Sequence, residues 1–545
     1  MTSVTRPPDQ PEPDQIEPDE IGSEAKTETA NAAYGKMSHR EVIQALSGLM
    51  LGMFVSILAS TIVSNALPRI IADLGGTQSV YTWIVTTELL AMTATVPLWG
   101  KMADLYSKKL LIQISLSLFV VGSLIAGFTP NVGVLIVSRV VQGVGAGGMG
   151  ALALIVMAAM IPPRELGRYS GMFGAVFGVA TIAGPLIGGV LVDTSWLGWR
   201  WCFFIGVPFS VAAIALLQKT LHLPRTPRKA VSIDWLGAFL ITAGVCDLLI
   251  WSTLAGNHFA WASGPTAVFV AGGLLLLGLA VWVESRAKEP IIPLSIFRSR
   301  TVSLTIVASV LVGLAMFGGT VFLSQYFQIS LGKSPTVAGL MSLPLIFGLL
   351  VSSTVAGQLI TKYGRWKAYL VAGAVVMTAG MVLLSMIDAH TSVLILSLYM
   401  AVLGIGVGML MQNLVLAAQN DVPAHELGAT TSSLTFFRSM GGAIGVSALG
   451  AVLASRVTSL LAERFGTTAT GGTAKVPDLA TLPPEVLAVV RDVYGEATAD
   501  LFLVGAPIAL LAVIAVLFIK EKPLHTLSGD ERRAQEEAAA GVPTH

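Results

Sequence analysis

Charged residues are scarce in this sequence. Asp, Glu, Lys and Arg together make up 12% of its 545 residues, against about a quarter in globular chains. The 33 basic and 32 acidic side chains almost balance, which excludes the basic surface that a nucleic-acid-binding protein needs. Hydrophobic residues make up 54% of the chain. This composition predicts an all-α polytopic membrane protein embedded in a lipid bilayer.

Cysteine is almost absent, since the chain has only Cys202 and Cys246, both inside apolar runs. Two such residues cannot form a disulfide framework and match no metal-ligand spacing, so we expect no metal and no cofactor. No cleavable signal peptide is expected either, because the first apolar run begins only near Val42. The Pro-, Asp- and Glu-rich residues 1–40 are predicted to form a disordered cytoplasmic tail.

Sites for nucleotide hydrolysis and for catalysis are also lacking. Gly332-Lys333-Ser334 ends like a nucleotide-binding loop, but Phe327 stands where that loop has its first glycine, so no ATP is expected. His258 and His425 have no histidine partner at zinc-site spacing. The sequence therefore predicts neither an ATP-driven protein nor an enzyme.

Long apolar runs are abundant. A helix needs about 20 apolar residues to cross the hydrocarbon, and this window predicts fourteen spans. They lie at 44–66, 80–100, 110–129, 132–153, 169–192, 202–219, 235–254, 265–284, 302–325, 336–360, 367–387, 391–415, 430–453 and 500–520.

The Lys and Arg residues of the short loops predict the orientation, because such residues collect on the cytoplasmic side. With the amino terminus inside, the inner loops hold sixteen of them, and the short outer loops hold only Arg69, Arg200 and Lys333. Both termini are thus predicted to lie in the cytoplasm. The predicted location is the plasma membrane, which the chain crosses many times. The polar stretch 455–499 is expected to be one long outer loop, either a solvated connector or a binding lid.

An internal repeat predicts how the spans are grouped. The segment 162–167 (PPRELG) has an echo at 423–428 (PAHELG), at an offset of 261 residues. A second echo relates Gly100 to Gly357, at an offset of 257. Both offsets equal eight spans, and an even number keeps the two copies parallel, as in two-lobed transporters.

Two six-helix lobes account for twelve spans and leave the seventh and eighth as an inserted pair. The predicted division is a tail at 1–40, an amino-terminal lobe at 41–220, the inserted pair with linkers at 221–300, a carboxy-terminal lobe at 301–520 and a cytoplasmic tail at 521–545.

Four ionisable residues fall inside predicted spans, where a charge is costly and usually functional. Glu88 and Arg139 each lie about seven residues, or roughly 10 Å, from the outer end of their helices. They are predicted to share one layer, as a proton carrier with its tuning cation or as a static ion pair. Asp247, in the inserted pair, is a candidate for proton coupling or for a buried hydrogen-bonding role. Arg438 is either an interlobe ion-pair partner or a residue that reaches the inner interface.

Several motifs resemble those of the major facilitator superfamily, and in particular its fourteen-span drug:proton antiporters. Residues 100–109 (GKMADLYSKK) are similar to the loop motif of that superfamily, and 138–145 (SRVVQGVG) to its fourth-helix motif with a buried arginine. Residues 184–189 (GPLIGG) resemble its antiporter motif. Residues 61–68 (TIVSNALP) and 199–204 (WRWCFF) resemble signatures of the fourteen-span family. The first-helix aspartate of that family is replaced by Ala59, which leaves Glu88 as the only carboxylate of its layer.

The resemblance implies roles for many residues. Asp104 would cap a helix of the other lobe as a latch, and the bend at Gly184-Pro185 would seal the lobe interface against proton leak. Gly188 and Gly189, which lack side chains, are expected to let a neighbouring helix approach closely. The residues implied in gating are Gly100, Asp104, Lys108, Lys109, Gly184, Pro185, Gly188 and Gly189. Candidates to line a substrate cavity are Asn65, Trp83, Gln325, Tyr326, Gln328, Met409, Gln412, Asn413, Phe437 and Arg438.

The sequence thus predicts a monomeric major facilitator protein that exchanges protons for a lipophilic small molecule such as a drug or antibiotic. A channel is disfavoured, because a two-lobed repeat serves alternating access. The alternative is an exporter of the same fold whose cargo is a physiological lipid, siderophore or peptide.

Overall fold

The computed structural model describes residues 39–74, 78–194, 197–221, 234–255, 259–465 and 483–539, and within these ranges all regular elements are helices. Thirteen of the described helices are long and apolar enough to cross a membrane. The one predicted span that is not among these thirteen is 80–100. It corresponds to the 28-residue helix α3 (Gln78–Leu105), whose sequence is less apolar because it contains five threonines and Glu88. The chain therefore has the predicted all-α polytopic architecture.

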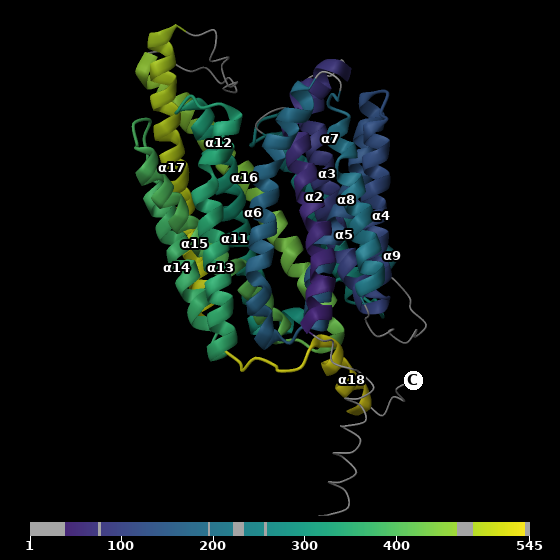
Figure 1. Ribbon diagram of the computed structural model, residues 1–545. Helices are drawn as coiled ribbons and strands as arrows, with labels where there is room; N and C mark the ends of the chain where they lie inside the picture. The colour runs from purple at the N-terminus through teal and green to yellow at the C-terminus, as the bar shows by residue number, and fades with distance from the viewer. Residues whose placement is uncertain are drawn as a thin grey trace, which may run out of the picture.

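The amino-terminal lobe is a bundle drawn in purple to blue in Figure 1. Its helices are α2 (His39–Leu74), α3 (Gln78–Leu105), α4 (Lys108–Gly127), α5 (Val132–Met160), α6 (Pro163–Asp193), α7 (Trp201–Phe204) and α8 (Gly206–Thr220). The expected span 202–219 is thus divided at Ile205. Pro208 explains the division, because it has no N–H to donate to the carbonyl of Phe204.

The inserted pair consists of α9 (Trp235–Leu254) and α10 (Gly264–Glu284). These helices pack on each other, and α9 also contacts α3 and α16, one helix from each lobe. The pair therefore lies against a junction between the two lobes.

The carboxy-terminal lobe, drawn in green to yellow, stands beside the first (Figure 1). Its elements are η1 (Leu294–Arg298), α11 (Arg300–Ile329), α12 (Pro335–Met341), α13 (Leu343–Tyr363), α14 (Lys367–Leu384), α15 (Val393–Gln419), η2 (Ala424–Glu426), α16 (Leu427–Phe465), α17 (Pro484–Leu517) and α18 (Gly529–Ala539). The expected span 336–360 is divided at Ser342, because Pro344 occupies the first turn of α13 and cannot extend α12.

The expected outer loop at 455–499 is wrong in its extent. Helix α16 continues to Phe465 and α17 already begins at Pro484, and only residues 466–482 lie outside the described part of the chain. The charged residues that made this stretch look like a loop form ion pairs between the two helix extensions. Arg456 Nε lies 2.7 Å from Asp500, and Arg464 Nη2 lies 3.2 Å from Glu496. Paired charges on facing helices make the polar extensions compatible with helix.

The two lobes meet along two seams. Helix α3 packs on α16, and α6 packs on α13. We call the end of the bundle where α3 ends and α18 lies the termini end, and the opposite end the distal end (Figure 1). Among the described residues, the basic residues where α3 gives way to α4 (Lys101, Lys108 and Lys109) and where α13 gives way to α14 (Lys362 and Lys367) lie at the termini end.

Single cysteines test the orientation of the bundle. Tyr363 and His390 are exposed residues that flank α14 at the termini end and the distal end. In a variant lacking Cys202 and Cys246, we expect a membrane-impermeant thiol reagent to label Tyr363→Cys only from inside and His390→Cys only from outside, because basic loops stay in the cytoplasm. Labelling of intact cells and inverted vesicles measures this. Labelling of both positions from one side would contradict the predicted topology.

Candidate functional site

Glu88 and Arg139 form an ion pair in the interior of the amino-terminal lobe. Arg139 Nη2 donates to Glu88 Oε2, and the two residues are only 5% and 1% exposed. Helix α3 supplies the acid and α5 the base, as counting along the predicted spans suggested. Such a pair is costly to separate, because either charge left alone would be buried without compensation.

Further polar groups surround this pair. Arg139 Nη1 donates to Gln142 Oε1 at 2.7 Å, and Gln142 Nε2 donates to the hydroxyl of Ser123 on α4 at 2.8 Å. Ser60 of α2 donates to Glu88 Oε2 at 3.4 Å. Four helices thus meet at one carboxylate and one guanidinium, which we call the Glu88 network. Ser60 follows Ala59 directly, so the contact places this part of α2 at the same depth as Glu88, as the sequence predicted.

Sequence reasoning missed the supporting members of this network. Gln142 lies three residues after Arg139 and therefore on the same helix face, a spacing that could have revealed it. Ser123 and Ser60 gave no such signal, because a serine in an apolar span can bond to its own helix backbone.

Asp247 lies apart from the Glu88 network. It lies on α9 and faces Gly272 and Gly273 of α10. The Asp247 carboxylate is close to this helix, since a Cβ added to Gly273 would lie 3.0 Å from Asp247 Oδ2. The structure therefore places this acid inside the inserted pair, and its part in proton coupling stays a prediction.

Arg438 is a buried cation on α16, with 9% of the residue exposed. Among the described residues its one hydrogen bond joins Nη1 to the Met411 carbonyl at 3.5 Å, and it has no ion-pair partner there. The predicted alternative of an ion pair between the lobes thus finds no acid in the described part of the chain. An uncompensated cation in this position favours a nearby acceptor or anion.

Asp104 joins the lobes at the termini end of the α3–α16 seam. Its Oδ1 accepts from the N–H of Gly428 and its Oδ2 from the N–H of Ala429, both at 2.8 Å. These N–H groups belong to the first turn of α16, where a helix carries unpaired donors and partial positive charge. This is the contact that the sequence predicts for Asp104, and its role in gating stays a prediction.

Two pairs of glycines allow the helices to touch at the seams. A Cβ on Gly100 would overlap the Gly428 carbonyl, and a Cβ on Gly428 would overlap that of Gly100. Gly167 and Gly357 face each other in the same way on the α6–α13 seam. The repeat offsets of 257 and 261 convert one pair into the other, so the seams are related by the internal symmetry.

The basic residues of the loop motif make separate contacts. Lys101 Nζ lies 2.6 Å from Glu289, in the linker that follows the inserted pair. Lys108 Nζ lies 3.2 Å from Asp530 of α18. Lys109 donates to the Gln218 carbonyl within its own lobe at 2.7 Å. Two of these three lysines thus tie the end of α3 and the start of α4 to other parts of the chain.

The antiporter motif lies within α6, which is helical throughout 163–193. Gly184 packs against Thr61 of α2, and Gly188 is buried. The side chain of Pro185 lies outside the described residues. The expectation of close approach is wrong for Gly189, since a Cβ there would meet nothing within 4 Å.

Two of the expected cavity residues have local partners instead. Tyr326 is buried, and its hydroxyl donates to the Asp388 carbonyl at 2.6 Å. The Thr391 hydroxyl donates to the Asp388 carboxylate at 2.8 Å and lowers the pKa of that acid. Met409 packs against Gly373 of α14, within its own lobe. Both residues therefore stabilise the carboxy-terminal lobe.

The other expected cavity residues are spread over the bundle. Gln412 and Asn413 line a small void at the lobe boundary, together with Met157 and Leu166 of the first lobe. Phe437 packs edge-on against Phe297. Trp83, Gln325 and Gln328 are partly exposed. The side chain of Asn65 lies outside the described residues.

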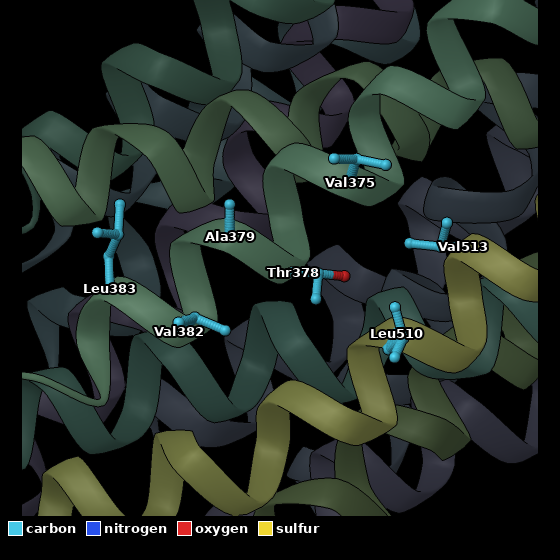
Figure 2. A pocket seen from close by; sticks show the side chains of 7 residues that line it. All are labelled: Val375, Thr378, Ala379, Val382, Leu383, Leu510 and Val513. Atoms are coloured by element: carbon cyan, nitrogen blue, oxygen red, sulfur yellow. The ribbon is translucent and has the colours of Figure 1, made fainter.

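A larger apolar groove, of about 440 Å³, lies between α14 and α17 (Figure 2). Its lining contains one polar side chain, Thr378, whose hydroxyl donates to the Ala374 carbonyl at 2.9 Å. The groove belongs to one lobe and contains none of the predicted site residues. Its other lining residues are Val375, Ala379, Val382, Leu383, Leu510 and Val513.

Comparison with known proteins agrees with this architecture. The Major Facilitator Superfamily matches residues 49–446. The chain is 34% identical to the multidrug transporter protein MdtP of Bacillus subtilis, with 85% of this chain and 82% of that protein aligned. It is 37% identical to an MFS-type transporter of Mycobacterium tuberculosis, over 89% and 70% of the two chains. Multidrug resistance protein 3 of Bacillus subtilis is 28% identical, over 89% and 97%.

Solved structures share the fold. The proton:xylose symporter XylE superposes with a TM-score of 0.58 at 15% identity, covering 92% of this chain and all of that one. The human organic anion transporter MFSD10 gives a TM-score of 0.56 at 14% identity, covering 86% and 99%. Two six-helix lobes, an inserted pair and the superfamily match lead to one conclusion: the chain belongs to the Major Facilitator Superfamily of membrane transporters.

Proposed function

We propose that this transporter is a proton-coupled exporter of lipophilic compounds from the cytoplasm, in which Glu88 carries the coupling proton. The observation that carries the proposal is the Glu88 network, a carboxylate and a guanidinium buried together among four helices. The relatives named as multidrug transporters support a lipophilic cargo.

The network links proton binding to rearrangement. When Glu88 takes up a proton it no longer compensates the charge of Arg139, so that the guanidinium must find other acceptors. Gln142 Oε1 and the carbonyl of Ile84 already accept from Arg139, at 2.7 and 3.5 Å, and do not replace the lost negative charge. Loss of the proton restores the ion pair. Two protonation states therefore favour two arrangements of α3 against α5.

The driving force is sufficient for accumulation. One proton that enters down the membrane potential provides about 2.3 kcal/mol per 100 mV, to which the pH gradient adds. One proton per transport cycle thus supports more than a tenfold ratio of cargo concentrations across the membrane, since a tenfold ratio corresponds to about 1.4 kcal/mol.

The closed termini end supports alternating access. In this structure Asp104 and both glycine pairs hold the lobes together at that end. In the predicted orientation this end faces the cytoplasm, and the cargo enters when it opens. We assign Gln412 and Asn413 to the path of the cargo, because they line the void at the lobe boundary, and Arg438, because it is a buried cation without an ion-pair partner among the described residues.

Replacement of Glu88 tests the proton carrier. In liposomes with an imposed pH gradient, we expect Glu88→Gln to lower the initial rate of gradient-driven dye transport by about tenfold or more, because glutamine cannot exchange a proton. Dye binding and dye exchange without a gradient should persist. The matched control is Glu463→Gln, an exposed acid far along α16. Near-normal gradient-driven transport by Glu88→Gln would make the ion pair static and the proposal wrong.

Replacement of Asp104 tests the latch. Asp104→Asn keeps the volume but loses one acceptor and the charge, so we expect the ratio of open to closed states at the termini end to rise by about tenfold. Distances between spin labels on the two lobes measure this ratio. Asp492→Asn, a partly exposed acid of α17 at the distal end, is the control. Unchanged distance distributions would reduce Asp104 to a structural cap.

The cargo is tested in cells. Drug susceptibility and dye efflux, compared between cells that express and cells that lack the protein, distinguish a broad lipophilic cargo from a dedicated lipid, siderophore or peptide. Broad resistance supports the proposal. Unchanged susceptibility with intact protein in the membrane favours the dedicated cargo.

A further inference from the structure

The chain after α17 crosses the termini end of the bundle and touches both lobes. We define residues 518–539 as the strap; it contains an extended segment and the helix α18. In Figure 1 the strap runs in yellow beneath the carboxy-terminal lobe, and α18 lies below the amino-terminal lobe. The sequence predicted only a tail from residue 521.

The first part of the strap is fixed to the carboxy-terminal lobe. Glu521 Oε1 accepts from the N–H groups of Trp366 and Lys367 at 2.8 and 3.1 Å, and thereby caps α14. Lys522 Nζ lies 2.5 Å from Asp421, which is buried at the end of α15. Asn420 donates to the Pro523 carbonyl at 2.9 Å. This part stays with its own lobe when the lobes move.

The strap then crosses to the amino-terminal lobe. The N–H of Arg164, at the start of α6, donates to the His525 carbonyl at 3.3 Å. Ser528 and Glu531 form a reciprocal capping box that starts α18: the Ser528 N–H donates to Glu531 at 2.7 Å, and the Glu531 N–H donates to Ser528 Oγ at 3.3 Å. Gly529 fits between Leu427 and Ala158, which belong to different lobes.

Helix α18 makes contacts with both lobes. Toward the amino-terminal lobe, Asp530 pairs with Lys108, and Arg533 Nη1 donates to the backbone carbonyl of Asp104 at 3.3 Å. The Lys108 and Asp530 side chains are only 14% and 18% exposed, so water screens this pair weakly.

Toward the carboxy-terminal lobe, the main contact is the buried Arg532. Its guanidinium donates to the carbonyls of Gln419 and Val422, at 3.3 and 2.5 Å. Glu536 accepts from the N–H of Ala424 at 3.1 Å. These acceptors form the turn that leads into α16, the same helix whose first turn binds Asp104.

We propose that α18 is a releasable lock on the termini end, which holds the lobes closed there and detaches from Lys108 and Asp104 each time that end opens. When the lobes separate, one short helix cannot keep its contacts with both. The contacts are ionic and polar, and α18 is a strongly polar helix (GDERRAQEEAA) with little apolar surface to bury. Its release therefore costs little hydrophobic free energy.

A labelling experiment on the full-length protein tests the lock without any assumption about cargo or coupling ion. Ser432 is buried at the α3–α16 seam against Gly100, so Ser432→Cys, in a chain lacking Cys202 and Cys246, should react with a hydrophilic maleimide only when the termini end opens. We expect Asp530→Lys to increase the labelling rate about tenfold, because it replaces the ion pair with Lys108 by a repulsion between two lysines.

A charge swap keeps the test decisive if Asp530→Lys folds poorly. Lys108→Asp should open the end in the same way, and the double variant Lys108→Asp with Asp530→Lys should restore slow labelling, which a general loss of stability would not do. The control is Gln535→Lys, which adds a positive charge on the exposed face of α18. Equal labelling rates in Asp530→Lys and the parent, or fast labelling that the swap fails to reverse, would overturn the proposal.

Discussion

A charge inside a membrane protein persists only when a partner charge or a dense set of hydrogen bonds compensates it, and this constraint organises the present structure. Glu88 and Arg139 compensate each other across α3 and α5. Asp104 is compensated by the first turn of a helix from the opposite lobe. Arg438 has a single long hydrogen bond in the described part of the chain. Positions with complete compensation hold helices together, and the incompletely compensated one suits contact with a mobile ligand.

The features that could be predicted from sequence are those with a strong one-dimensional signal. Apolar length gave the spans, and counting from the helix ends brought Glu88 and Arg139 to one depth, because a helix rises regularly along its axis. The repeat offsets related the two lobes before any helix was placed. That Asp104 caps a helix of the other lobe followed from its position and from the resemblance to known loop motifs, but the identity of that helix, α16, did not.

The features that could not be predicted depend on contacts between distant segments. The extensions of α16 and α17 are polar, which predicts a loop. They are helical in the structure, where Arg456 of α16 pairs with Asp500 of α17. Helix α18 carries a capping box in its sequence, yet nothing in a polar tail indicates that Arg532 will be buried against carbonyls more than a hundred residues away. Gly189 shows the opposite error, since a motif suggested a close contact where the structure leaves open space.

The two seams share their glycine pairs but differ in the acid. The offset of 257 that relates Gly100 to Gly357 places Thr361 where Asp104 would be, and the Thr361 hydroxyl donates to the Gly357 carbonyl of its own helix at 3.0 Å. Helix α9 of the inserted pair contacts both helices of the α3–α16 seam, and Arg533 of α18 donates to the Asp104 carbonyl. The α3–α16 seam therefore carries a charged contact between the lobes that the equivalent position of the α6–α13 seam lacks, so the internal symmetry of the fold does not extend to the contacts that join its halves.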